Sequence, residues 1–114
     1  MKLNYDLLRS LLLHIEDVTD GHTNYTFDYF VEQFPKESQN CLYYHLKYLG
    51  DACLIEGNAS YVIDITPYGR EYLDSIRDNS IWEKTKSKFQ PLGSVTLPII
   101  IEIAKSLVLK QLGL

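Results

Sequence analysis

Apolar residues recur at helical spacing at the start of the chain and again near its middle. The first stripe predicts a helix over residues 4–18, for which Asn4 is a suitable N-cap. The second stripe predicts a helix over residues 36–50, whose opposite side is polar and aromatic. The two stripes consist of Leu7, Leu8, Leu11, Leu12 and Ile15, and of Leu42, Leu46 and Leu49.

The stretch between these two helices fits two different periodicities. Aromatic and β-branched residues alternate with other residues in YTFDYFV, residues 25–31, and this alternation favours a strand. Apolar residues at helical spacing support a competing short helix over residues 26–34. We expect the strand, and Pro35 then opens the following element.

Two short apolar runs after the second helix predict a β-hairpin. The runs are ACLIEG, and YVIDI at residues 61–65, and the intervening GNAS suits a tight turn. The stretch TPYGREYLDSIRD then begins a third helix, with Thr66 as its cap and Pro67 in its first turn. Gly69 costs about 1 kcal/mol relative to Ala in a helix interior. Close approach to a neighbouring helix is the expected compensation.

Two more helices are predicted in the last third of the chain. The tetrapeptide SIWE is a capping box with Ser80 as the N-cap, and its helix runs to about Phe89. Trp82 lies on one stripe with Phe89, which indicates packing. The final helix covers residues 97–112, with Thr96 as a candidate cap. Its apolar residues occupy at least half of its circumference, so it is expected to lie between two layers or to cover a second subunit.

The predicted order of elements is helix, strand, helix, strand, strand, helix, followed by the two C-terminal helices. This order is that of a winged helix, an α+β fold, mainly α, in which a small antiparallel sheet closes a helical core. We therefore expect a winged-helix domain over residues 1–78. Residues 79–114 are expected to form a helical extension that packs on this domain or on a second subunit.

Two stretches of the sequence resemble a known pattern. YHLKYLGDACLIEG followed by IDITPYGREYLDSI is similar to winged helix-turn-helix transcriptional regulators, where such residues end the recognition helix and follow the wing. The chain more closely resembles a small uncharacterised winged-helix family of bacteria and their prophages, classed as a domain of unknown function. That resemblance extends over nearly the whole chain and is most specific in ITPYGREYLDSIRDNSIWEKTK and the ending KQLGL. It implies a fold and no demonstrated activity.

The chain departs from these patterns in two places. Cys53 stands where the family usually has Gly, just after a helix end, where a positive φ costs a non-glycine residue about 1 kcal/mol. Gly50 is the alternative stop signal for that helix. The strand expected over residues 25–31 also leaves no separate first helix for a helix-turn-helix, which argues against standard docking in the major groove.

Charge is distributed unevenly along the chain. Residues 1–78 contain six Lys or Arg and thirteen Asp or Glu, a net charge of −7. Residues 79–114 contain five Lys and two Glu, a net charge of +3. Nucleic-acid binding usually requires a basic patch, because neutralising phosphates supplies much of the affinity. The predicted winged helix lacks such a patch.

Two hypotheses for the function follow from these patterns. The first is a transcriptional regulator that binds double-stranded DNA through the helix at 36–50 and the hairpin turn. The second is a protein–protein interaction module on the same scaffold, favoured by the aromatic helix face and the acidic charge. The candidate contact residues are Lys36, Gln39, Asn40, Tyr43, Tyr44, Lys47, Asn58 and Ser60. A secondary basic patch, or simply a solvated face, consists of Lys84, Lys86 and Lys88.

A homodimer through the apolar final helix is a separate expectation. The candidate contact residues for this dimer are Ile101, Val108 and Leu112.

Other classes of function are not expected from this sequence. It contains no nucleophile elbow, phosphate loop or paired-carboxylate pattern, so neither an enzyme nor a cofactor is predicted. Cys41 and His45 lie four apart but lack the further ligands that a zinc site needs, so no metal is expected. No uncharged apolar run reaches the ~18 residues of a membrane span. Two cysteines without a C-x-x-C pair fit a reducing cytoplasm.

Overall fold

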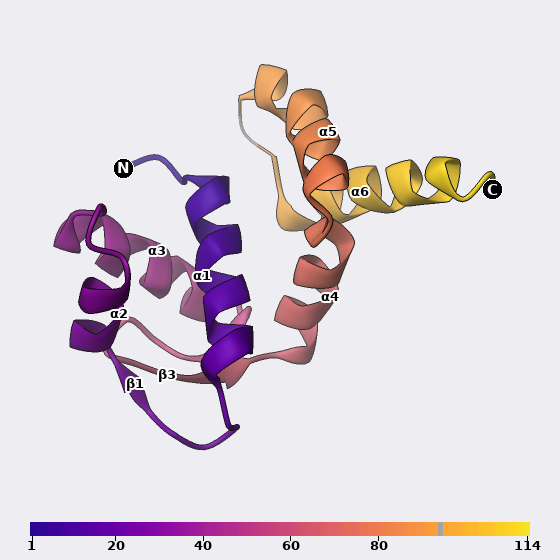
Figure 1. Ribbon diagram of the computed structural model, residues 1–114. Helices are drawn as coiled ribbons and strands as arrows, with labels where there is room; N and C mark the ends of the chain where they lie inside the picture. Colours follow the sequence, from indigo (N-terminus) through magenta and orange to yellow (C-terminus); the bar gives the residue numbers. More distant parts are fainter. Residues whose placement is uncertain (94) are drawn as a thin grey trace. The chain divides into compact units, whose positions relative to one another are not determined.

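The computed structural model describes residues 1–93 and 95–114 (Figure 1). The chain is mainly helical, with one three-stranded antiparallel sheet, and its class is α+β as predicted. It forms two compact units, Met1–Arg70 and Glu71–Leu114. The division between the units falls within the helix α4, Pro67–Ile76.

The core of the first unit lies between two helices at the predicted places. Helix α1 spans Tyr5–Val18, and the side chain of Asn4 caps it by accepting a hydrogen bond from the Leu7 N–H. Helix α3 spans Gln39–Asp51 and packs against α1. The apolar stripes of both helices are buried as expected, and they consist of Leu7, Leu8, Leu11, Leu12 and Ile15, and of Leu42, Leu46 and Leu49.

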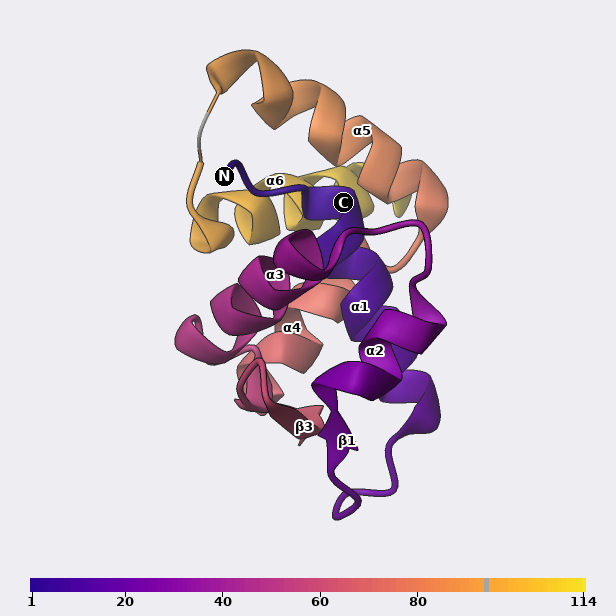
Figure 2. The same ribbon diagram turned by 90° about the vertical axis from the view of Figure 1, so that its left-hand side faces the viewer.

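The strand predicted over residues 25–31 is wrong for most of its length. Strand β1 contains only Tyr25–Thr26, and helix α2 begins directly after it, spanning Phe27–Gln33. The hydroxyl of Thr26 accepts a hydrogen bond from the Tyr29 N–H and thereby caps this helix. Phe30, one of the apolar residues at helical spacing, is buried. This segment therefore follows the helical period and not the strand alternation. Helices α2 and α3 lie side by side, joined by a short connection (Figures 1 and 2).

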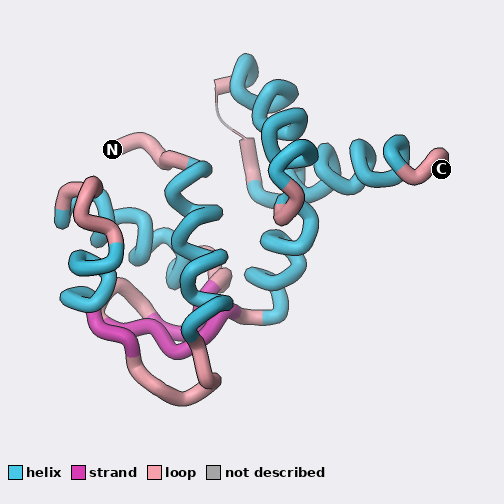
Figure 3. Tube along the Cα trace, in the orientation of Figure 1, coloured by secondary structure: helices cyan, strands magenta, loops and turns pink. Residues whose placement is uncertain are grey.

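The sheet joins β1 to the hairpin that follows α3. Strands β2, Ile55–Gly57, and β3, Tyr61–Ile65, pair antiparallel, and the strand order is β1-β3-β2 (Figure 3). The Phe27 N–H at the start of α2 donates to the Ser60 carbonyl in the turn. The two-residue strand β1 therefore ties the start of α2 to the hairpin.

Three residues control how the end of α3 turns into the hairpin. Cys53 has a φ of 60°, so the left-handed conformation considered for this position is confirmed. Gly50 is not the stop signal, because α3 continues to Asp51. A Cβ on Gly50 would instead lie 2.8 Å from the Gly57 carbonyl oxygen. The turn of the hairpin thus lies directly on the last turn of α3.

Helix α4 begins as predicted, but Gly69 approaches a different neighbour from the one expected. The Thr66 hydroxyl accepts a hydrogen bond of 2.9 Å from the Gly69 N–H. A Cβ on Gly69 would collide with the backbone carbonyl of Leu54, which precedes β2. The expected close approach is real, but the neighbour is this loop and not a helix.

The second unit contains a pair of packed helices. Helix α5 spans Asn79–Phe89, and a short 3-10 turn over Gln90–Leu92 follows it. The cap of α5 is Asp78 and not Ser80, because the Asp78 carboxylate accepts from the Ile81 N–H and leaves Ser80 inside the first turn. As expected, Trp82 is buried with Phe89, their ring centres 6.1 Å apart.

Helix α6 spans Leu97–Gln111 and packs against α5. Thr96 stands at its N-cap position without making a side-chain capping bond. The residues of α6 that are buried are Leu97, Ile100, Ile101 and Ala104.

The helices that the structure describes are all too short or too polar to cross a membrane.

Candidate interaction face on helix α3

The predicted contact residues of α3 emerge together on its exposed side. Ser38 begins the helix by accepting a hydrogen bond from the Cys41 N–H. The buried leucines turn one side of α3 into the core, so the polar and aromatic side faces outward. The exposed residues on this side are Gln39, Asn40, Tyr43, Tyr44 and Lys47. Lys36 is also exposed, but it lies in the connection before α3 and not on the helix as predicted.

Two tyrosines give this side an aromatic character. Tyr43 is 49% exposed and Tyr44 is 38% exposed. The Tyr43 ring meets Phe27 of α2 edge-on, with ring centres 5.8 Å apart. The Tyr44 ring meets His45 in the same way at 5.6 Å. Each exposed ring therefore has a neighbouring ring that restricts its rotamers.

The hairpin adds a third exposed tyrosine next to this contact. Tyr61 is 40% exposed at the start of β3 and pairs across the sheet with Thr26, the residue before Phe27. We call the surface made by Phe27, Tyr43, Tyr44 and Tyr61 the aromatic face. Phe27 and Tyr61 do not follow from sequence reasoning, because Phe27 meets α3 through helix α2. Tyr61 is placed opposite Thr26, the neighbour of Phe27, by the pairing of β1 with β3.

Asn58 and Ser60, the candidate contact residues of the hairpin turn, both take part in hydrogen bonds that hold the turn. The Asn58 side-chain oxygen accepts hydrogen bonds from the Ser60 and Tyr61 N–H groups at 2.8 and 3.3 Å. The Ser60 carbonyl accepts from Phe27, and Ala59 between them is buried. Asn58 therefore closes the turn, whereas the exposed Ser60 hydroxyl stays at the surface.

The electrostatics of the aromatic face are neutral to acidic. The Lys47 ammonium lies 2.6 Å from the Asp51 carboxylate, and this hydrogen bond raises the pKa of Lys47. Glu56, in β2 and close to the turn, is exposed and adds a negative charge. The unit Met1–Arg70 contains five Lys or Arg and ten Asp or Glu, a net charge of −5. A strong positive field for phosphates is therefore missing from this unit.

The polar groups on the inner side of the unit build the fold. His14 packs edge-on against Phe34 at 5.5 Å, and its Nε2 lies 2.7 Å from the Tyr29 hydroxyl. Burial lowers the pKa of His14, and the nearby Asp17 opposes this effect. His14 of α1 thus packs against residues of α2 and its C-cap.

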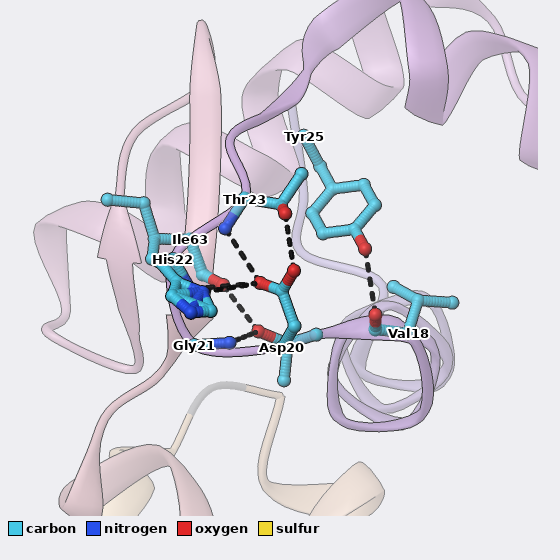
Figure 4. Close-up of polar contacts among 8 residues, drawn as sticks. Val18, Asp20, Gly21, His22, Thr23, Tyr25 and Ile63 are labelled. Atoms are coloured by element: carbon cyan, nitrogen blue, oxygen red, sulfur yellow. Dashed lines mark hydrogen bonds and ion pairs between the residues drawn. The ribbon is translucent and has the colours of Figure 1, made fainter.

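The loop between α1 and β1 is organised by one carboxylate (Figure 4). Asp20 accepts hydrogen bonds from the backbone N–H groups of His22 and Thr23 and from the Thr23 hydroxyl. The Thr23 hydroxyl is the main reason that the pKa of Asp20 is far below its usual value. The Thr19 hydroxyl donates to the Ile63 carbonyl and ties this loop to β3.

The remaining candidate residues lie in the second unit. Lys86 is held by Glu83 at 3.1 Å and lies 5.5 Å from the centre of the Trp82 ring, whereas Lys84 and Lys88 are exposed. Among the dimer candidates, Ile101 is buried within the chain and Val108 is half-buried. Leu112 is 67% exposed, so it alone of the three lies fully at the surface.

Comparisons with known proteins place the chain in a family. A family model described as "Hypothetical protein (DUF2513)" matches residues 2–95. An "Uncharacterized protein" of Haemophilus influenzae (strain ATCC 51907 / DSM 11121 / KW20 / Rd) is 31% identical over 122 residues, which cover 99% of this chain and 100% of the relative. No solved structure matches the chain. The chain therefore belongs to the DUF2513 family of domains of unknown function.

Proposed function

We propose that the first unit, together with α4, is a winged helix that binds a partner protein through its aromatic face. The element order α1-β1-α2-α3-β2-β3 and the sheet order β1-β3-β2 support the fold. In this scheme α2 and α3 are the helix-turn-helix, and the hairpin of β2 and β3 is the wing. The helix that sequence reasoning missed is the first helix of this motif.

The composition of the exposed side of α3 is the observation that best supports a protein as the partner. Tyrosine is enriched in the centres of protein interfaces, and charged residues are depleted there. Tyr43 and Tyr44 offer large rings, and Phe27 supports one of them from α2. The Lys47 charge is compensated by Asp51 on the same helix. These features suit the core of a protein interface better than a phosphate backbone.

Site-specific photo-crosslinking tests this function. A benzoylphenylalanine replaces Tyr43 in the full chain, and the control carries it at Ser10, an exposed position of α1. In the source cells, the probe at position 43 is expected to capture a discrete protein that the probe at position 10 does not capture. The purified partner should bind the Tyr43→Ala/Tyr44→Ala double variant at least about 10-fold more weakly. Capture that is the same at both positions contradicts the proposal.

DNA binding is the second candidate function, and one observation favours it. Gln39 and Asn40 lie exposed in the first turn of α3, after the short connection from α2. Amide side chains there have the donors and acceptors to pair with adenine in a major groove. The net charge of −5 in this unit opposes this function, because non-specific affinity comes mainly from cations near phosphates.

Fluorescence anisotropy separates the two candidates. Labelled 30-base-pair duplexes of random sequence are titrated with the full chain at low salt, where electrostatic binding is strongest. We expect no binding up to concentrations of about 10 µM, well into the usual range of non-specific affinities. Saturable binding that weakens with salt, and that the Gln39→Ala/Asn40→Ala variant loses, would instead establish DNA binding.

A further inference from the structure

The second half of α6 carries more apolar surface than its contacts with α5 use. The buried residues of α6 end at Ala104, and every residue from Lys105 to Leu114 is at least partly exposed. Leu109 is 49% exposed and Leu112 is 67% exposed. Figure 1 shows this part of α6 extending past α5. An exposed apolar helix surface of this kind commonly marks an interaction site.

The side of α6 that faces away from its buried residues has a regular composition. We call it the outer face, and all of its members are exposed. It consists of Ile99, Glu102, Ser106, Leu109 and Lys110. The spacings of three and four residues place these side chains along one line of the helix. Neither Glu102 nor Lys110 has an ion-pair partner among residues 1–93 and 95–114.

The outer face is complementary to a second copy of itself in the antiparallel direction. If two α6 helices cross at Ser106, each residue lies opposite the one equally far on the other side of Ser106. Glu102 then meets Lys110 of the other copy, twice by symmetry. Ser106 meets its own counterpart, and its small side chain permits axes about 8–9 Å apart.

The half-buried Ile103 beside this line continues the match. Ile103 lies opposite Leu109 of the other copy under the same symmetry. A shallow hollow lies along α6 next to the end of α5, with a volume of about 350 Å³ and Ile103, Ser106 and Lys110 in its wall. A parallel pair of helices would instead place Glu102 beside Glu102. The charges therefore select the antiparallel arrangement.

We propose that the chain forms a twofold symmetric homodimer through the outer faces of α6, with Ser106 at the crossing point. The interface involves only the second unit and is independent of the aromatic face. It replaces the predicted contact at Ile101, whose side chain is already buried within the chain. The contact is small, so we expect a reversible dimer with a dissociation constant on the order of 10–100 µM.

A charge-swap experiment tests this dimer on the full chain. Sedimentation equilibrium is recorded from about 5 µM to about 1 mM at low salt, a range that covers the expected dissociation constant. Glu102→Lys alone places Lys against Lys, and Lys110→Glu alone places Glu against Glu. Each single variant should dimerise at least about 10-fold more weakly than the unaltered chain. An equimolar mixture of the two should recover the dimer, because both of its pairs are again of opposite sign.

Lys105→Glu is the matched control. It makes the same charge change on the same helix, but Lys105 lies outside the outer face and pairs with Glu71 at 3.4 Å. The dimer should keep its dissociation constant within about 3-fold in this variant, since the changed charge lies at the rim. A chain that stays monomeric at the highest concentration overturns the proposal. A dimer whose dissociation constant is unchanged by Glu102→Lys and by Lys110→Glu also overturns the proposal.

Discussion

The imidazole of His45 in α3 accepts a hydrogen bond of 2.8 Å from the backbone N–H of Asn4, the residue that caps α1. Its Nδ1 lies 2.8 Å from the Cys41 carbonyl one turn earlier in α3 and donates to it. The ring is 1% exposed. A polar ring in the core thus joins the beginning of α1 to the middle of α3, across 41 residues of sequence.

Replacing this ring should destabilise the chain. His45→Leu keeps most of the volume but leaves the Asn4 N–H without its acceptor, which should lower the free energy of unfolding by about 1–3 kcal/mol. His45→Ala adds a cavity and should cost about 2–5 kcal/mol. Urea unfolding followed by circular dichroism measures both values. Tyr44→Ala, at the exposed neighbouring position, should cost less than about 1 kcal/mol. A leucine variant as stable as the unaltered chain would show that the hydrogen bond contributes nothing.

Gly69→Ala should be among the most damaging single-methyl changes in this protein. The added Cβ would collide with the backbone of Leu54, which cannot move away like a flexible side chain. We expect a loss of at least about 3 kcal/mol, despite the better helix propensity of Ala. Gly21→Ala is the control, because Gly21 has a φ of +89° and open space around it. That change should cost only about 1–2 kcal/mol. Similar losses in thermal unfolding of the two variants would argue against the collision.

Cys53→Gly should stabilise the chain. Cys53 is exposed and has a φ of 60°, so its side chain contributes strain and little packing. Gly removes the strain but increases the entropy of the unfolded chain, and the expected net gain is about 0.5–1 kcal/mol. Cys53→Ala keeps the left-handed residue and should give no such gain. Chemical unfolding under reducing conditions compares the three proteins, and an equal gain from Ala would exclude backbone strain as the cause.

His14 should make the stability depend on pH. Burial lowers its folded pKa below the ordinary value of 6.5, so the unfolded chain binds the proton more tightly. The free energy of unfolding should therefore be highest above about pH 6.5 and fall as the pH drops from there towards the folded pKa. His14→Gln removes this contribution and should lose less stability between about pH 7.5 and about pH 5.5. Equal losses in the two proteins, measured by urea unfolding, would contradict this role of His14.

Local signals in the sequence predict much of the first unit. The helices α1 and α3, the strand β3 and the start of α4 follow from apolar spacing and from the caps Asn4 and Thr66. Residues 27–33 satisfy both periodicities, and the choice depends on the Thr26 cap and on the burial of Phe30 in the core. Contacts with the core decide between helix and strand in this segment, so its local sequence pattern alone cannot predict which one forms.

The candidate site, like the fold, can be predicted from the sequence only in part. The exposed side of α3 follows from its helical period, and the Lys47–Asp51 pair has the i,i+4 spacing that sequence reasoning recognises. Phe27 joins the aromatic face through the packing of α2 on α3, and Tyr61 through the pairing of β1 with β3, and no local pattern specifies either contact. Gly69 shows the same limit, because its neighbour Leu54 is distant in sequence and belongs to no helix.

The two-residue strand β1 has a consequence for the proposed binding of a partner by the aromatic face. It joins the start of α2 to the hairpin turn through the Phe27–Ser60 hydrogen bond, while Gly50 allows the same turn to lie directly on α3. The rings are therefore carried on a scaffold in which the hairpin turn is held against both α2 and α3 before any encounter. Little conformational entropy remains to be lost on association. Substitutions on this face should consequently act on the lifetime of a complex, leaving its rate of formation nearly constant.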